Sequence, residues 1–238
     1  MSTPVRVVPS PNIWRWPAVY EVENRAQDAD GAIWSLLREQ CDWAGSDVLD
    51  VGCGDGFHLP VFATTARAVL GVEPHAPLVR RALDRTAQLG NVRVLAGEAQ
   101  RLPAPDASVD LVHARTAYFF GPGCEPGIAE SDRVLRPGGA LVVVDLDADR
   151  PPYGDWMRAD LPRYDSRQVR RFFAQAGFDC HEVATEWRFD RRAELEAVLR
   201  IEFGKRTAAR AIAETAGLTV PVGYRVHIRR KPTGLVLR

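Results

Sequence analysis

The sequence predicts a doubly wound α/β fold, with seven strands in one mostly parallel sheet and helices on both of its faces. Short apolar runs rich in β-branched residues alternate with helical patterns from residue 47 onward. Such runs are typical of parallel strands buried on both faces, and the alternation predicts right-handed crossovers. A glycine-rich turn follows the first strand, at the edge where open α/β sheets bind ligands. The 238 residues suffice for one such domain with an elaboration.

Each element follows from a local pattern. We expect strands at residues 47–51, 68–73, 91–96, 108–113, 140–146, 180–189 and 218–228. Apolar residues at helical spacing predict helices at about 30–43, 56–66, 76–88, 125–135, 192–203 and 205–216. A further helix is expected between Asp165, as its N-cap, and Gly177, just past its end. The last strand alternates in a half-exposed pattern, and Pro221 indicates a bulge or an edge near its start.

The composition excludes several classes of function. The chain has 31 basic and 31 acidic residues and a formal net charge of zero, which argues against nucleic acid or an anionic membrane as a partner. Its four cysteines form no CxxC pair and no Cys/His ligand spacing, so we expect reduced thiols in a cytoplasmic protein and no metal site. No stretch reaches the ~18 apolar residues of a membrane span.

The turn after the first strand reads VLDVGCGDGFHLP, residues 48–60. A phosphate-binding Walker loop needs a lysine and a Ser/Thr after its last glycine, and neither follows Gly56. A dinucleotide-binding loop needs a third glycine where this chain has Phe57. S-adenosylmethionine is the third candidate, because it carries a sulfonium and an ammonium but no phosphate. Asp50 would attract that ammonium, whereas it would repel a pyrophosphate.

This loop resembles the first motif of class I S-adenosylmethionine-dependent methyltransferases, and later segments resemble the family's other motifs in order. Glu73 lies 17 residues past Gly56, where the family has an acidic residue that holds both ribose hydroxyls. Residues 95–114, 135–145 and 175–178 resemble the motifs around the third to sixth strands. The resemblance covers about residues 45–185, and it implies a Rossmann-like fold with an antiparallel last strand.

The resemblance also implies which residues bind the cofactor, S-adenosylmethionine, and its product, S-adenosylhomocysteine. Glu98 takes the place of the aspartate that usually contacts the adenine amino group in the family, and it is one methylene longer. Tyr20 is expected near the methionine end. The expected cofactor-binding set is Tyr20, Asp50, Gly52, Cys53, Gly54, Gly56, Glu73, Pro74, Glu98, Ala99 and Ala114.

The candidates for catalysis are His58, His113 and Arg115, because they adjoin the motifs in sequence. Each has core packing or an internal ion pair as its alternative role. Methyl transfer depends mainly on in-line approach of the acceptor atom, and a base is needed only when that atom must lose a proton. The sequence therefore leaves the acceptor atom open.

Substrate specificity in the family resides in variable segments. Here these are residues 1–44, an ordered but irregular arm over 1–25 followed by a helix, and residues 148–164, an insertion within the domain 45–238. Both contain aromatic residues, and we expect both to close a lid over a small-molecule acceptor. The alternatives are a protein or nucleic-acid methyltransferase and a non-catalytic S-adenosylmethionine-binding protein. The oligomeric state is left open.

Overall fold

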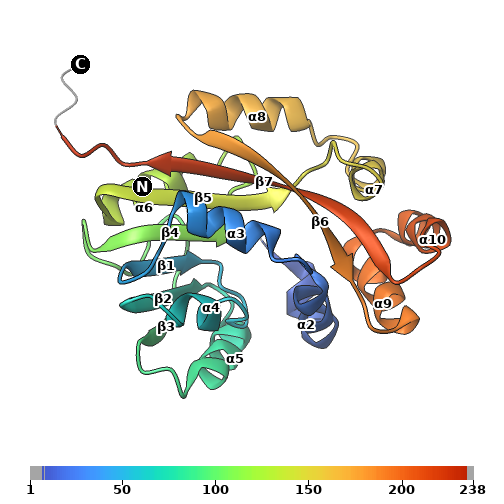
Figure 1. The fold of residues 1–238 in the computed structure, drawn as a ribbon, viewed down its shortest axis with the longest axis horizontal. Helices are drawn as coiled ribbons and strands as arrows, with labels where there is room; N and C mark the ends of the chain where they lie inside the picture. Colours follow the sequence, from blue (N-terminus) through green and yellow to red (C-terminus); the bar gives the residue numbers. More distant parts are fainter. Residues whose placement is uncertain (1–6, 8, 235–238) are drawn as a thin grey trace.

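The computed structural model describes residues 7 and 9–234, which form one seven-stranded sheet flanked by helices (Figure 1). The strand order is β3-β2-β1-β4-β5-β7-β6. Pairing is parallel from β3 to β5, and β7 is antiparallel to both of its neighbours. The predicted fold class is confirmed. The strands are β1 (Asp47–Val51), β2 (Ala68–Glu73), β3 (Val92–Ala96), β4 (Val109–Arg115), β5 (Leu135–Leu146), β6 (Asp179–Arg188) and β7 (Thr219–Arg230).

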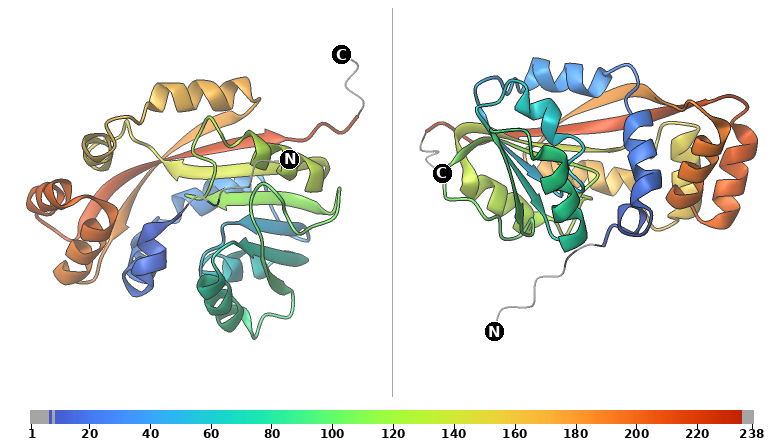
Figure 2. Two further views of the ribbon diagram at one scale, coloured as in Figure 1. Left: turned by 180° about the vertical axis from the view of Figure 1, so that it is seen from behind. Right: turned by 90° about the horizontal axis from the view of Figure 1, so that it is seen from below.

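Helices cover both faces of the sheet (Figure 2) and bury a separate apolar core on each side. Because successive strand residues point to opposite faces, β5 places Val142 in one core and Leu141 in the other. The helices are α1 (Pro11–Arg15), α2 (Pro17–Ala26), α3 (Ala32–Gln40), α4 (Leu59–Ala63), α5 (Ala76–Thr86), α6 (Glu125–Val134), α7 (Tyr153–Asp160), α8 (Ser166–Gln175), α9 (Arg192–Glu202) and α10 (Lys205–Glu214). None of the described helices is long and apolar enough to cross a membrane.

The arm expected to be irregular is helical. Pro11 and Pro17 stand at the first positions of α1 and α2. Proline suits that position, because the N–H it lacks has no partner inside the helix and its φ is already helical. The prolines that suggested irregular chain therefore begin two helices. α2 packs beside α9. In Figure 1 it lies between α9 and α5.

The segment expected to form a second lid instead contains α7, which contributes to the core. Tyr153 and Trp156 are buried there, and the Tyr153 ring lies 5.0 Å from Trp187 and 5.2 Å from Phe203, between ring centroids. Tyr153 and Trp156 thus pack between the sheet and α9, and Tyr164 packs against the core on the other face of the sheet. This placement does not support a lid at 148–164.

β7 is buried along most of its length, which corrects the half-exposed pattern expected for it. It pairs with β5 on one side and β6 on the other, so the residues between its apolar positions also lie under helices. His227, 2% exposed, stacks on Phe173 of α8 at 4.2 Å between ring centroids. Pro221 pairs with β6 alone, beyond the end of β5, which is the edge position its missing N–H requires.

Candidate active site

A pocket opens at the carboxyl ends of β1, β2 and β4. The strand order reverses between β1 and β4, and such a switch point is where doubly wound sheets bind ligands. The loops after these strands form its floor. Helices α1 and α2 form part of its wall, through residues such as Ile13, Trp14 and Tyr20.

The glycines of the first loop are required by their backbone conformation and by their neighbours. Gly52 and Gly54 have φ angles of +69° and +58°, which side-chain-bearing residues rarely adopt. A Cβ on Gly52 would lie 2.6 Å from Ala117 Cβ, and a Cβ on Gly54 would lie 2.9 Å from Ile13 Cδ1. The glycine loop is therefore packed between the segment that follows β4, which contains Ala117, and the N-terminal arm, which contains Ile13.

Glu73 ends β2 with its carboxylate fixed by backbone donors. Gly54 N–H donates to Oε2 at 3.1 Å, and His75 N–H donates to Oε1 at 2.9 Å. Glu73 is 4% exposed and lines the pocket. Burial raises the pKa of this carboxyl, and the two N–H groups partly offset that effect. Each oxygen retains a lone pair for a donor from a ligand.

Asp50 and His113 lie behind the pocket wall and contact each other. Asp50 Oδ1 is 2.7 Å from His113 Nδ1, and the two residues are 3% and 1% exposed. The rings of Trp34 and Phe62 flank His113, and its Nε2 has no partner among the described residues. Neither residue lines the pocket, because their mutual hydrogen bond keeps both side chains in the core. The expected direct roles, an ammonium contact for Asp50 and a proton acceptor for His113, do not fit this placement.

The other predicted residues divide by position. Ten line the pocket: Tyr20, Gly52, Cys53, Gly54, His58, Glu73, Pro74, Glu98, Ala99 and Arg115. Gly56 and Ala114 do not line it; a Cβ on Gly56 would lie 3.1 Å from Ala82 of α5, and Ala114 is fully buried in β4. Their placement is that of packing positions beneath the loop.

His58 lines the pocket from the N-cap of α4, which begins at Leu59 and not at residue 56 as expected. Burial lowers the pKa of this imidazole, and the nearby Arg115 charge lowers it further. The ring is therefore neutral at neutral pH and able to accept a proton, although as a weak base.

Arg115 ends β4 at the inner end of the pocket. Its Nη2 donates to Gln27 Oε1 at 3.0 Å, and its guanidinium carbon lies 5.3 Å from the centroid of the Tyr224 ring. The arm also supplies Trp14, Asn24 and Gln27 to the lining. Sequence reasoning missed Asn24 and Gln27 because it took the arm as irregular, whereas Trp14 is one of the arm's aromatic residues that it expected in the lid.

A sequence signal for the missed residues exists. Tyr20, Asn24 and Gln27 follow one another at i, i+4 and i+7, which places polar side chains along one helix face. Trp14 of α1 stacks on His75, with 4.4 Å between ring centroids and 12° between ring planes. This contact fixes α1 to the segment that follows β2.

Comparison with known proteins matches this geometry to a family. Residues 49–143 match the family model of a methyltransferase domain. A probable S-adenosylmethionine-dependent methyltransferase of Mycolicibacterium smegmatis is 34% identical over 111 residues, which are 47% of this chain and 41% of that protein. These matches support a class I S-adenosylmethionine-dependent methyltransferase domain in this chain. The crystal structure of the YcgJ protein from Bacillus subtilis has the same fold, with a TM-score of 0.61 at 18% identity over 84% of this chain and 98% of that one.

One relative of this methyltransferase chain matches along most of its length. The 27-O-demethylrifamycin SV methyltransferase of Amycolatopsis mediterranei is 29% identical over 208 residues, which are 82% of this chain and 76% of that protein. The first curated relatives are matched over only 31% to 52% of their own lengths. They establish the shared methyltransferase domain rather than the activity of a whole protein.

The pocket fits S-adenosylmethionine, the cofactor of the family. Glycine at positions 52 and 54 leaves room in the pocket, because a Cβ there would contact Ala117 or Ile13, which line it. Carboxyl groups of Glu73 and Glu98 line the same cavity, and carboxylates accept hydrogen bonds from hydroxyl and amino groups.

Proposed function

We propose that this protein transfers a methyl group from S-adenosylmethionine to a small-molecule acceptor. The observation that carries the proposal is the placement of Glu73, a buried carboxylate fixed against the glycine loop, at the head of a pocket that continues to His58 and Arg115. When bound, the cofactor supplies a methyl group on a cationic sulfur, which is already a strong electrophile. The protein's task is then to orient the two reactants and exclude water.

Each end of the pocket has a proposed role. Glu73 accepts hydrogen bonds from the ribose hydroxyls. Glu98 accepts one from the adenine amino group, with the Ala99 N–H next to the ring. The glycine loop lies along the ribose and methionine parts, and Tyr20 borders the methionine end. These assignments are supported by the lining of the pocket.

The acceptor end lies between His58 and Arg115, where the pocket reaches β4. If the methyl group is transferred to a hydroxyl oxygen, His58 is the proposed base that takes up the hydroxyl proton, because its imidazole is neutral and lines the cavity. His113 has the role of a buried partner of Asp50.

A small-molecule acceptor is favoured by the wall that the chain places over its own pocket. Residues 1–44 serve as the proposed lid, since Ile13, Trp14 and Tyr20 line the cavity from α1 and α2. A pocket covered by its own N-terminal helices leaves little room for a protein or nucleic-acid surface. The neutral net charge and the relative that is named for a rifamycin agree with this choice.

Two measurements test the proposal. Calorimetry with S-adenosylhomocysteine and with NADH is expected to detect binding of the first alone. Incubation with methyl-labelled S-adenosylmethionine and a metabolite extract is expected to transfer label into the small-molecule fraction. Label only in protein or RNA would replace the small-molecule acceptor with a macromolecular one. Binding without any transfer would identify a non-catalytic binding protein.

A further inference from the structure

Arg115 is a buried cation without an ionic partner. The residue is 8% exposed and lines the pocket. Its Nε has no hydrogen-bond partner, and no carboxylate forms a salt bridge with it within the part of the chain that the structure describes. Its side-chain hydrogen bonds go to the amide oxygen of Gln27 and to the hydroxyl of Tyr224, and both of these groups are neutral.

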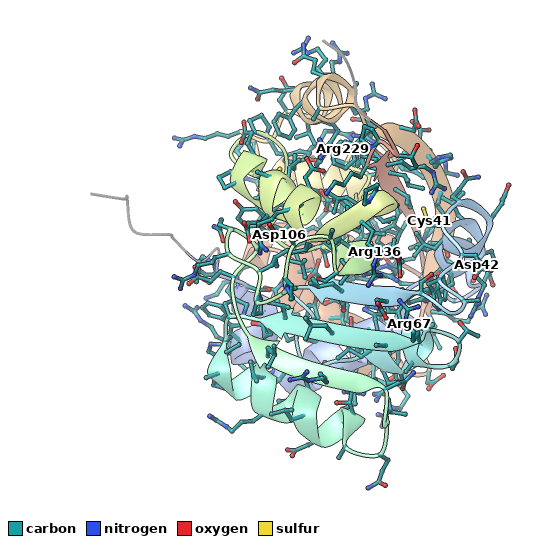
Figure 3. The ribbon with its side chains drawn as sticks, turned by 90° about the vertical axis from the view of Figure 1, so that its left-hand side faces the viewer. Cys41, Asp42, Arg67, Asp106, Arg136 and Arg229 are labelled. Carbon is teal, nitrogen blue, oxygen red and sulfur yellow. The ribbon has the colours of Figure 1, made fainter. Side chains whose placement is uncertain are left out.

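Two other arginines of the sheet, Arg225 and Arg136, are paired with carboxylates. Arg225, the comparably buried one, has Asp147 at 2.5 Å and Asp149 at 2.6 Å. Arg136, which Figure 3 labels, forms salt bridges of 2.8 Å to Asp47 and to Asp110 at the amino-terminal edge of the strands. Because a guanidinium stays protonated and a buried charge is costly unless it is paired, Arg115 is the exception that needs an explanation.

The nearest carboxyl groups form no salt bridge with Arg115 among the described residues, although the Arg115 charge lowers the pKa of Glu23 against the effect of burial. Gln27 Nε2 donates to Glu23 Oε1 at 2.8 Å, so Glu23 lies behind the amide. Glu202 accepts hydrogen bonds from Asn12 Nδ2, at 2.6 Å, and from the Tyr153 hydroxyl. Burial raises the pKa of both glutamates, and two adjacent buried carboxyls cannot both ionise. Neither lines the pocket.

We propose that Arg115 and Gln27 form a carboxylate-binding subsite at the inner end of the pocket. This inference rests on the proposed function. It adds to that function that the group bound beside Arg115 is negatively charged. The unpartnered guanidinium edge supplies a donor that a carboxylate oxygen matches. The Gln27 amide holds the guanidinium in place without neutralising it.

Two molecules carry a carboxylate to this position: an acidic methyl acceptor and the methionine part of the cofactor. The N–H groups of Gly52 and Cys53 donate to Val72 O, and that of Gly54 donates to Glu73. The glycine loop thus has few donors left for the cofactor's own carboxylate. The experiment therefore has one arm for each source.

The first arm measures calorimetric binding of S-adenosylhomocysteine and of its decarboxylated analogue to wild-type protein and to Arg115→Gln. If the subsite holds the cofactor's carboxylate, wild-type protein prefers S-adenosylhomocysteine by at least about tenfold, and Arg115→Gln loses this preference. The second arm adds benzoate, or the neutral benzamide, to protein saturated with S-adenosylhomocysteine. If the subsite serves an acidic acceptor, benzoate alone raises the melting temperature, and only when Arg115 is present.

Gln27→Glu is the matched second variant. It keeps the size of the side chain and places a carboxylate next to Arg115, so the fold is retained while the subsite is filled from within. We expect it to remove the carboxylate preference as Arg115→Gln does. Preferences that survive both variants, in both arms, overturn the proposal. If wild-type protein fails to bind S-adenosylhomocysteine, the proposed function fails instead, and benzoate added to ligand-free protein still tests the subsite.

Discussion

Glu73 is held by two backbone N–H groups, and it has no cationic partner among the residues described. A carboxylate positioned in this way keeps its acceptor capacity for a neutral donor such as a hydroxyl. A neighbouring arginine would compete for that capacity. The environment of the side chain thus agrees with its proposed role toward the ribose.

The substitution Glu73→Ala is expected to weaken binding of S-adenosylhomocysteine at least about tenfold, because each charge-assisted hydrogen bond contributes about 1.5–3 kcal/mol. Calorimetry measures the change. Circular dichroism checks that the variant folds, since the loss of Glu73 also frees the N–H groups of Gly54 and His75. An unchanged affinity in a folded variant rules out the ribose assignment.

His227 gives the protein a residue-level dependence of stability on pH. Burial lowers the pKa of this imidazole to about 4, against about 6.5 in an unfolded chain. Between these values the unfolded state binds a proton that the folded state excludes. The free energy of unfolding therefore falls as the pH falls below about 6.5.

Replacement of His227 by phenylalanine removes this proton uptake and keeps an aromatic ring against Phe173. From pH 7 to pH 5 we expect wild-type protein to lose about 2 kcal/mol more stability than His227→Phe. Urea unfolding at the two pH values measures the difference. Burial raises the pKa of Asp145 to about 6. This shift increases the stability of the folded state as the pH falls, but it contributes equally to the wild-type protein and the variant. Parallel losses in the two proteins contradict the prediction.

The N-terminal helices are the element that distinguishes this pocket from a bare sheet edge. Three contacts hold α1 in place. Trp14 stacks on His75, Ile13 lies against Gly54, and Asn12 donates to Glu202 of α9. Because these contacts join α1 to the segment after β2, to the glycine loop and to α9, the position of α1 depends on all three.

The chain offers a matched pair for testing the lid. Trp14 lines the pocket, whereas Trp16 is 56% exposed. We expect Trp14→Ala to raise the dissociation rate of S-adenosylhomocysteine by about 2- to 10-fold, the range given by an aromatic stack of about 0.5–1.5 kcal/mol. Trp16→Ala should leave the rate unchanged. Stopped-flow displacement measures both, and equal effects of the two substitutions contradict the lid.

At the scale of the whole molecule, the cofactor pocket joins parts that are distant in sequence. The loops after β1, β2, β3 and β4 meet the arm at one cavity. A ligand bound there contacts segments that separate when the chain unfolds. Its binding free energy therefore adds to the stability of the folded state.

S-adenosylhomocysteine at one hundred times its Kd is expected to stabilise the protein by about 2.7 kcal/mol. For a domain of this size, that corresponds to a rise in Tm of about 5–11 °C. Differential scanning fluorimetry measures the shift, and NADH at the same concentration serves as the control. Glu73→Ala at the wild-type ligand concentration should show a smaller shift. Equal shifts with the two ligands contradict a specific site.

The sequence predicted the sheet because its strands are short, apolar and regularly separated by helices. The resemblance to a family also pointed to Glu73, Gly52 and Gly54, which line the pocket, and their roles toward the cofactor stay predictions. It did not predict the helical arm, since prolines at residues 11 and 17 indicate a break as readily as a helix start. A chain break and a helix start look alike in the local sequence. What distinguishes them is tertiary packing, and here α2 packs against α9.

Local pattern by itself therefore determined the order of the elements, the glycine loop and the acidic residue after β2. The tertiary structure decided which of the neighbouring polar residues meet the pocket. His58 and Arg115 line it, while His113 turns inward to Asp50. The reason is physical: a side chain's direction, partners and charge balance depend on residues far away in sequence. Gln27 beside Arg115, 88 positions away, is one of them.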